Sequence, residues 1–263
     1  MQSSRRVARE LALKVLFQVD VGKQPLSEVL EGVSRQICMS LDSSANQAAR
    51  EAQTDLRNVA SQRIEAVGDR MSAQASRQIR TVSTAMATEI RRLAERASEI
   101  ARNLCDRPAE GSGEAAVSQF HEASEETGAA VWKLASRESI YPGILRELAE
   151  AAMRRAEQME AVMANQAPAI EATAAFMLPL VHGVTEKREE IDRRLAERST
   201  GWALDRQAAV DRNIMRLAAY EILYNPDIPP GASINEAVEL AKKYSTAESG
   251  RFVNGVLGSL SER

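Results

Sequence analysis

Apolar residues near the start of the chain recur at intervals of three and four positions, the period of an α-helix that buries one side. These residues are Ala8, Leu11, Ala12, Val15, Leu16 and Val19. Ser3 or Ser4 is a suitable N-cap for this helix. The pattern resumes after Gly22, where Pro25 suits a first helical position. The apolar residues that follow predict a short second helix; they are Leu26, Val29, Leu30 and Val33.

The segment that follows Pro168 is again apolar at helical spacing. Its apolar residues are Phe176, Met177, Leu180, Val181, Val184, Ile191 and Leu195. Pro179 is expected to start or kink a helix, because proline has no backbone N–H to donate. We therefore expect helical structure from about residue 170, with a break or bend near Pro179.

Three more helices are predicted at the C-terminal end. The first contains Trp202, Leu204, Val210, Ile214, Leu217, Ala218, Ile222 and Leu223. The prolines of residues 225–231 end it, and Ser233 or Asn235 is expected to cap the next helix. The last helix contains Phe252, Val253, Val256, Leu257 and Leu260.

The middle of the chain has a different pattern. From Ala45 to Leu104 there is no proline and only one glycine, Gly68. Its later apolar residues are spaced by about 3.5, as in a coiled-coil seam; they are Ile79, Val82, Met86, Ile90, Leu93, Ala97, Ile100 and Leu104. A single helix of this length would extend about 90 Å, so it must pair with another helix or break.

A partner for this segment follows in the chain. Residues 106–114 contain one proline and two glycines and predict a reversal. Residues 115–166 are again helical in pattern, with an interruption at Tyr141-Pro142-Gly143. The net charge is +3 over residues 45–105 and −5 over residues 106–167, which favours an antiparallel helical hairpin. The alternative is a poorly packed or partly disordered alanine-rich pair.

Composition supports an all-α fold and limits the chemistry. Aromatic residues make up 4% of the chain, which nearly excludes a β-sandwich or barrel. The net charge of −3 means that any nucleic-acid site is a local patch. Cys38 and Cys105 are far apart and there are two histidines, so we expect no metal site, no disulfide framework and no cofactor. No signal peptide or membrane span is predicted, and the expected compartment is the cytoplasm.

Two basic clusters are candidates for binding phosphates. Arg5, Arg6 and Arg9 lie at the start of the first helix, while Lys242, Lys243 and Arg251 lie near Phe252. An aromatic ring beside basic residues suits single-stranded RNA, since the ring stacks on a base while the cations hold the backbone. By themselves the arginines could equally be a solvated helix start, and Phe252 a core residue.

The C-terminal part of the chain resembles the NusB family of bacterial transcription antitermination factors. The resemblance is carried by VDRNIMRLAAYEIL at 210–223 and by DIPPGASINEAVELAKKYSTAESGRFVNGVL at 227–257. RRVARELALKVLFQVD at 5–20 is similar to the first helix of the family, and MLPLVHGV at 177–184 is similar to the third. Pro179 is a departure, because the family normally continues a helix there.

The resemblance implies a discontinuous domain with a large insertion. Residues 1–34 and 170–263 would form the NusB-like RNA-binding domain, a helical bundle of two small packed subdomains. Residues 35–169 would form an inserted antiparallel helical hairpin or coiled coil. The core fold can survive such an insertion if its ends lie close together.

The resemblance also implies partners and sites. NusB-like proteins bind boxA-like single-stranded RNA in ribosomal RNA transcription, which assigns RNA binding to Arg5, Arg6, Arg9, Lys242, Lys243, Arg251 and Phe252. They pair with NusE, a ribosomal small-subunit protein, within the RNA polymerase antitermination complex, and this assigns partner contacts to Phe17 and Glu221. The family includes dimers, so a homodimer is one expected state.

Two other functions are alternatives to this one. A methyltransferase would need a glycine-rich loop after a strand, and the glycines of residues 111–114 follow a helical segment; we therefore expect no enzyme and no catalytic residue. The other alternative is a coiled-coil interaction protein in which the NusB-like domain is only a scaffold. RNA binding by the chain would distinguish the two.

Overall fold

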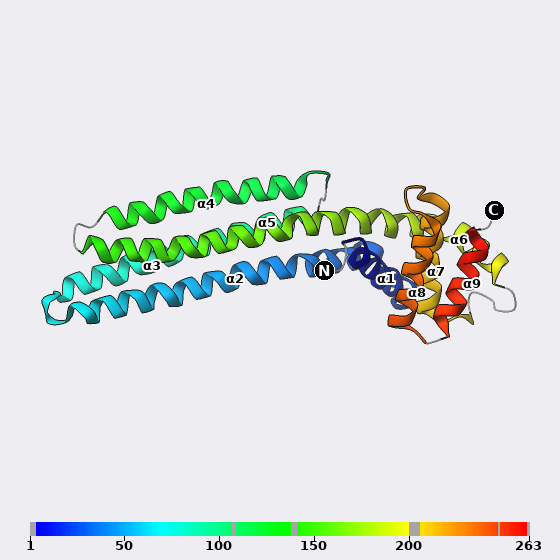
Figure 1. Ribbon diagram of the computed structural model, residues 1–263, viewed down its shortest axis with the longest axis horizontal. Helices are drawn as coiled ribbons and strands as arrows, with labels where there is room; N and C mark the ends of the chain where they lie inside the picture. The colour runs from blue at the N-terminus through cyan, green and yellow to red at the C-terminus, as the bar shows by residue number, and fades with distance from the viewer. Residues whose placement is uncertain (1–3, 107–108, 138–140, 200–205, 247, 262–263) are drawn as a thin grey trace. The chain divides into compact units, whose positions relative to one another are not determined.

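The structure is a computed structural model that describes residues 4–106, 109–137, 141–199, 206–246 and 248–261. Within these ranges every regular element is a helix, so the expected all-α class is confirmed (Figure 1). The α-helices are α1 (Ser4–Gly22), α2 (Leu26–Val67), α3 (Ala73–Asp106), α4 (Ser112–Ser136), α5 (Pro142–Glu186), α6 (Arg188–Arg198), α7 (Ala209–Tyr224), α8 (Pro230–Tyr244) and α9 (Ser249–Ser261).

The chain divides into two compact units. Residues 1–34 and 172–263 form the first, which we call the terminal unit, and residues 35–171 form the second, the central unit. Helices α2 and α5 carry residues of both units. The two units are described separately below.

The central unit is an antiparallel four-helix bundle of α2, α3, α4 and α5 (Figure 1). Contacts link each helix to the next along the chain: Arg91 of α3 donates to Gln53 of α2 at 3.1 Å, and His121 of α4 pairs with Glu160 of α5. Leu93 of α3 and Ala123 of α4 line one hollow. Arg155 of α5 reaches Asp55 of α2 at 2.6 Å, which closes the ring. This is the up-down topology of a four-helix bundle.

The predicted seam forms part of the bundle core. All eight of its residues, from Ile79 to Leu104, are buried. They share one cluster with Leu41 and Leu56 of α2, Phe120 of α4 and residues of α5. A heptad stripe therefore identified the buried face of α3 correctly.

The central unit differs from a two-armed hairpin because each arm folds back on itself. Gly68 has a φ of +59°, a left-handed conformation that favours glycine, and it separates α2 from α3. The second arm is divided at the predicted interruption, where Tyr141 has a φ of +53° and Pro142 begins α5. Four shorter helices bury more apolar area than two long ones, since each helix has two neighbours.

The fold also brings the two cysteines together, against expectation. Cys38 of α2 and Cys105 of α3 form a disulfide with a Cα–Cα distance of 6.6 Å, and both residues are buried. The turn at Gly68 lies near the midpoint between them, so antiparallel pairing of α2 and α3 places them opposite one another. Separation in sequence did not imply separation in space.

No helix starts at Pro179, because α5 continues through both Pro168 and Pro179. Each proline removes one backbone hydrogen bond, but the helix is anchored on both sides of each by buried residues: Met163, Ala167, Ile170, Met177 and Leu180. The expectation of no apolar span also needs correction. Residues 142–186 contain a window apolar enough to cross a membrane, yet half of that window is buried inside the protein, as in a core helix.

The terminal unit contains α1, the first residues of α2, the end of α5 and helices α6–α9. All the predicted stripe residues of α1 except the half-buried Val19 are buried, and Ile214, Leu217, Leu240, Val253 and Leu257 complete the core from α7, α8 and α9. Helix α2 is not short, since it extends to Val67. Ser233 and Asn235 do not cap α8, which begins at Pro230. The predicted positions Ser3, Trp202 and Leu204 lie outside the described residues.

Candidate functional site

A buried ion pair joins two of the predicted site residues in the terminal unit. Arg9 of α1 donates to both carboxylate oxygens of Glu221 on α7, at 2.8 and 3.1 Å. Ser233 of α8 donates to the same carboxylate at 2.6 Å. Arg9 is 7% exposed and Glu221 is 1% exposed. These two side chains therefore connect α1, α7 and α8 from inside the unit.

Arg6 lies one helical turn before Arg9 on α1 and is also paired. It donates to the two oxygens of Glu236 on α8, at 2.6 and 3.0 Å. The hydrogen bond from Arg6 is the main cause that lowers the pKa of Glu236, and the same bond raises the pKa of Arg6. The Arg6 side chain remains 44% exposed, so one side of its guanidinium faces solvent.

A third contact between α1 and α8 joins the predicted Lys243 to two residues that the sequence did not single out, Glu10 and Tyr244. Lys243 donates to Glu10 at 2.8 Å, and the Tyr244 hydroxyl donates to the same carboxylate at 3.0 Å. Burial raises the pKa of Glu10, but the bonds from Lys243 and Tyr244 outweigh it and the pKa is lowered. Tyr244 is 36% exposed and adds an aromatic ring to the predicted basic cluster.

The junction of α8 and α9 contributes the remaining predicted residues. Lys242 pairs with Glu239 at 2.8 Å on α8. A Cβ built on Gly250, the second residue of α9, would lie 3.5 Å from the Lys242 side chain, so the two helices are in contact there. Arg251 is exposed and Phe252 half-buried. Among the described residues no carboxylate lies within ion-pair distance of Arg251.

Arg5 is exposed and stacks on an aromatic ring. Its guanidinium lies 5.4 Å from the centre of the Phe176 ring of α5, and the guanidinium of Arg9 lies 5.1 Å from the same centre. A cation over an aromatic face is held electrostatically and keeps its outer N–H groups free to donate. In the part of the chain that the structure describes, Arg5 has no carboxylate partner.

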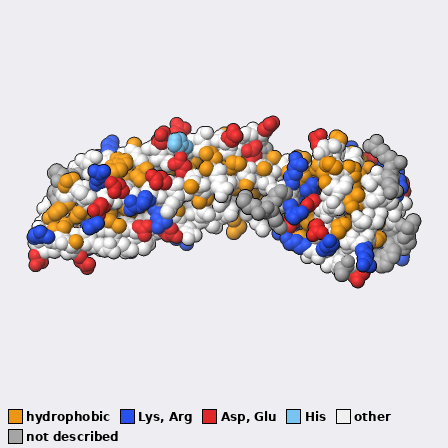
Figure 2. Space-filling view, in the orientation of Figure 1, with side chains coloured by type: hydrophobic (Ala, Val, Ile, Leu, Met, Phe, Trp, Pro, Cys, Tyr) orange, Lys and Arg blue, Asp and Glu red, His pale blue; other side chains and the backbone are white. Residues whose placement is uncertain are grey.

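The terminal unit therefore brings most of the predicted RNA-binding residues to neighbouring surfaces of α1, α8 and α9. Basic side chains gather over the α1 side of this unit in Figure 2. Arg6, Lys242 and Lys243 are each partly neutralised by a carboxylate, whereas Arg5 and Arg251 have none beside them among the described residues. Arg9 is the exception, since it is buried against Glu221.

The two predicted partner contacts lie in different environments. Phe17 of α1 is half-buried, so part of its ring is accessible. The Glu221 carboxylate is enclosed by Arg9 and Ser233 and is not on the surface of the unit. Because of this burial, Glu221 can act on a partner only through the position of α7.

A second polar network stabilises the opposite end of α1 and was missed in the sequence. Asp20 is 5% exposed and accepts hydrogen bonds from Arg188, Arg212, Asn213 and Arg216, at 2.7 to 3.2 Å. Arg216 also binds both oxygens of Asp192 at 2.7 Å. Burial raises the pKa of Asp20, but these donors lower it far more. Six polar residues from three helices, α1, α6 and α7, cannot be connected by spacing alone.

Comparison with known proteins places this unit in a family. The model of the NusB family matches residues 134–262. The transcription antitermination protein NusB of Frankia casuarinae is 46% identical over 110 residues, which cover 42% of this chain and 82% of that protein. The chain belongs to the NusB family. NusB of Symbiobacterium thermophilum is 52% identical over 90 residues, 34% of this chain.

Coverage of the NusB relatives is partial. The chain spans 59% of the length of the Symbiobacterium thermophilum protein and 63% of the Trichlorobacter lovleyi one. A solved structure of NusB from T. maritima is 35% identical, with a TM-score of 0.33 over 41% of this chain and 75% of that one. The recognition of a NusB family member from the C-terminal motifs is confirmed.

Proposed function

We propose that the chain is an antitermination factor that binds boxA-like single-stranded RNA together with NusE during ribosomal RNA transcription. Its family membership supports the class of function. The observation that carries the RNA site is the convergence of α1, α8 and α9. There Arg5 and Arg251 have no carboxylate partner among the described residues, and Phe252 and Tyr244 supply aromatic rings.

The site acts by binding and not by catalysis. Arg5, Arg6, Lys242, Lys243 and Arg251 hold phosphates, and the carboxylates beside three of them limit unspecific attraction. Glu236 at Arg6 and Glu10 at Lys243 compete with an RNA phosphate, so an RNA that also stacks its bases binds better than one held through phosphates alone. Arg9 positions α1 through Glu221. The proposed place of action is the cytoplasm, in the RNA polymerase antitermination complex.

A titration of the full chain with labelled RNA tests the proposal. The parent should bind boxA-like RNA more tightly than a scrambled RNA of the same length at fixed salt. Phe252→Ala should lose about 1–3 kcal/mol of binding to boxA-like RNA, the value of one base stacked on a ring. Arg251→Gln should weaken both RNAs equally and reduce the salt dependence, because it removes a phosphate contact.

The matched control is Arg198→Gln, which removes an exposed arginine at the end of α6 in the same unit. It should leave both affinities unchanged. Equal affinity of the parent for the two RNAs would contradict sequence-preferring binding. Parent-like binding by both Phe252→Ala and Arg251→Gln would show that the RNA site lies elsewhere.

NusE docking is proposed to use the accessible part of Phe17. Phe17→Ala should lower NusE affinity in calorimetry while RNA affinity without NusE stays at the parent value. Glu221 affects this interface only indirectly, because it is 1% exposed. If Phe17→Ala binds NusE as tightly as the parent does, Phe17 is not part of the interface.

A second candidate function is that of an interaction protein, with the central bundle as its working part. The specific observation is Trp132 of α4, which is 41% exposed; a large exposed aromatic ring is common in protein interfaces. This function would leave RNA affinity unchanged when the RNA site is altered, so the titration above separates the two.

A further inference from the structure

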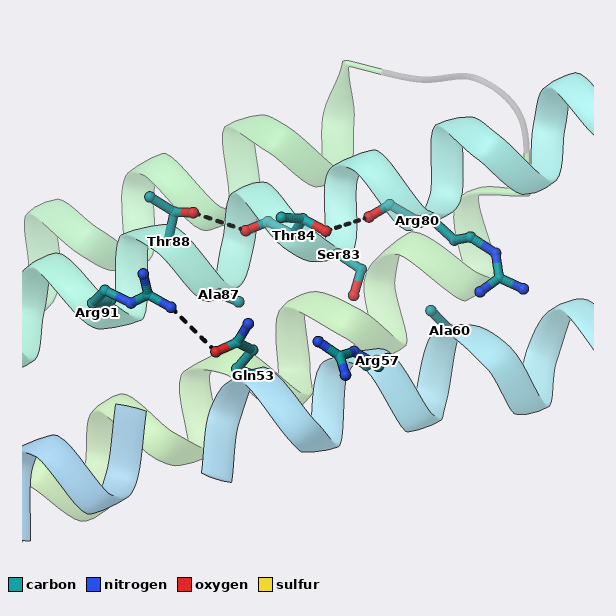
Figure 3. Close-up of a pocket in the computed structure, with 9 residues that line it drawn as sticks. All are labelled: Gln53, Arg57, Ala60, Arg80, Ser83, Thr84, Ala87, Thr88 and Arg91. Carbon is teal, nitrogen blue, oxygen red and sulfur yellow. Dashed lines mark hydrogen bonds between the residues drawn. The ribbon is translucent and has the colours of Figure 1, made fainter. Parts of the chain in front are cut away.

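A hollow on the central unit carries cations that have no assigned role. It lies between α2 and α3 and has a volume of about 400 Å³. Its floor is made of small side chains, Ala60 of α2 with Ser83 and Ala87 of α3, and all three are buried. Figure 3 shows these residues between the two helices. We call this hollow the α2–α3 cleft.

The charge of the cleft has one sign. Arg57 of α2 and Arg80 and Arg91 of α3 line it, and all three are exposed. No carboxylate is among the described residues of its lining. The only side-chain hydrogen bond of these arginines that the structure shows goes to a neutral group, from Arg91 to Gln53 at 3.1 Å. This contrasts with Arg155 and Arg92 of the same unit, which pair with carboxylates.

The floor of the cleft holds a hydroxyl group that makes no hydrogen bond to another described residue. Ser83 is 5% exposed, and its side chain points from α3 into the cleft in Figure 3. No hydrogen bond of the Ser83 hydroxyl is found among the described residues. Thr84 and Thr88 differ, because their hydroxyls already donate to the carbonyl oxygens of Arg80 and Thr84. The Ser83 oxygen is open to the cleft and is not sealed in the core, so its hydroxyl can donate to a bound acceptor.

The arginines are spread along the cleft in an order that limits the ligand. The Cα atoms of Arg80 and Arg91 are separated by about 16 Å along the axis of α3, at about 1.5 Å per residue. Gln53 lies opposite Arg91, so Arg57, one turn further along the antiparallel α2, lies opposite the segment between the two. One phosphate cannot contact cations over this distance, whereas a chain of phosphates can.

We propose that the α2–α3 cleft binds a linear chain of phosphates, with Arg57, Arg80 and Arg91 holding successive phosphates and Ser83 donating to one of them from the floor. The chain can be a free polyphosphate or the backbone of a single-stranded nucleic acid. The lining, as described, contains no aromatic ring, so the cleft recognises phosphates and not bases. This site goes beyond the proposed boxA site, which lies in the terminal unit, and does not depend on it.

Two probes test the proposal on the full chain: sodium tripolyphosphate in calorimetry, and labelled oligouridine in anisotropy over a series of salt concentrations. The triple variant Arg57→Gln/Arg80→Gln/Arg91→Gln should lose at least about tenfold in affinity for the probe that the parent binds. With oligouridine, the slope of log affinity against log salt should fall by about 2, since each lost contact to a single strand contributes about 0.7.

A control variant with the same loss of charge distinguishes a site from diffuse attraction. Arg50→Gln/Arg137→Gln/Arg154→Gln removes three exposed arginines of the central unit that lie outside the cleft lining. It should change affinity less than threefold. Ser83→Ala adds a readout at the floor and should lower affinity several-fold, while alanine in a helix keeps the fold.

The outcomes distinguish a free polyphosphate from a nucleic-acid backbone, and the α2–α3 cleft from the proposed boxA site. Binding of tripolyphosphate alone identifies a free polyphosphate, and binding of oligouridine identifies a nucleic-acid backbone; both support the cleft. An equal loss in the cleft and control variants, parent affinity in both the triple variant and Ser83→Ala, or no binding of either probe by the parent would overturn it. A chain that does not prefer boxA-like RNA would contradict the proposed function. The comparison of the cleft variant with the control variant would still test the cleft.

Discussion

Arg9 and Glu221 were identified in the sequence as site residues, but each was assigned to a surface contact, whereas both are buried. Both stand in motifs that resemble the NusB family, and spacing placed them on helices correctly. The sequence could not show that they bind each other, because they are 212 positions apart. Their bidentate, buried contact makes them a positioning pair for α1, α7 and α8.

Glu221→Ala should therefore destabilise the terminal unit by about 3–5 kcal/mol, because it leaves the Arg9 guanidinium buried without its carboxylate. Chemical denaturation followed by circular dichroism measures this change. The control is Glu239→Ala, which removes an exposed carboxylate that pairs with the exposed Lys242 and should cost less than about 1 kcal/mol. Parent stability in Glu221→Ala would show that the carboxylate is a surface group.

Asp20 gives a prediction with a pH dependence. Its pKa is lowered in the folded state from an ordinary value of 3.8. A lowered carboxyl pKa contributes stability that is fully present above that ordinary value and is lost as the pH falls through the folded-state pKa. Asp20→Asn should cost several kcal/mol at pH 7, because Arg188, Arg212 and Arg216 lose their shared carboxylate.

The stability difference between the parent and Asp20→Asn should shrink as the pH is lowered below about 4, toward the folded-state pKa. Urea titrations at several pH values measure it. A difference that stays constant with pH would mean that the Asp20 charge contributes no stability.

At the scale of helices, periodicity was reliable, and the sequence predicted the reversal at residues 106–114 and the interruption at Tyr141 but missed the turn at Gly68. The seam of α3 predicted its buried face, because an apolar stripe is a local property of one helix. The bundle needed information on where helices reverse. Gly68 was visible in the sequence as the one glycine of its segment. Treated as a turn, it would also have placed Cys38 opposite Cys105.

The contact between the start of α4 and α5 depends on a glycine. Glu171 of α5 accepts the backbone N–H groups of Gly111 and Gly113, at 2.9 and 2.8 Å. A Cβ on Gly113 would lie 2.9 Å from the Cα of Pro168, which is backbone and cannot rotate away. Gly113→Ala should therefore destabilise the central unit by about 1–3 kcal/mol.

Thermal unfolding of the central unit measures this effect, with Gly143→Ala as the control. Gly143 lies in the first turn of α5, and a Cβ there has open space. Alanine at Gly143 should be neutral or stabilising by up to about 1 kcal/mol. A melting temperature for Gly113→Ala as high as that of Gly143→Ala would contradict the close contact.

For the whole molecule, the sequence predicted the class of fold and the family and left the tertiary contacts open. Motifs in α7, α8 and α9 identify the family because they are continuous in sequence. The carboxylate partners Glu10 and Glu236, the ring of Tyr244 and the cleft arginines were missed, because each acquires its role from a helix distant in sequence. The assignment of residues 1–34 and 170–263 to RNA binding stays a prediction.

The proposed boxA-like RNA site lies within the terminal unit. Replacing residues 45–167 with a short Gly/Ser linker and measuring affinity for boxA-like RNA at fixed salt tests this location. The Ser40 hydroxyl of α2 donates to the side-chain oxygen of Gln166 on α5 at 3.2 Å, so the two helices are adjacent there and a short linker can join the cut ends. We expect a folded helical protein whose affinity stays within about threefold of the parent, since the site is unchanged. A folded protein that no longer binds boxA-like RNA would contradict it.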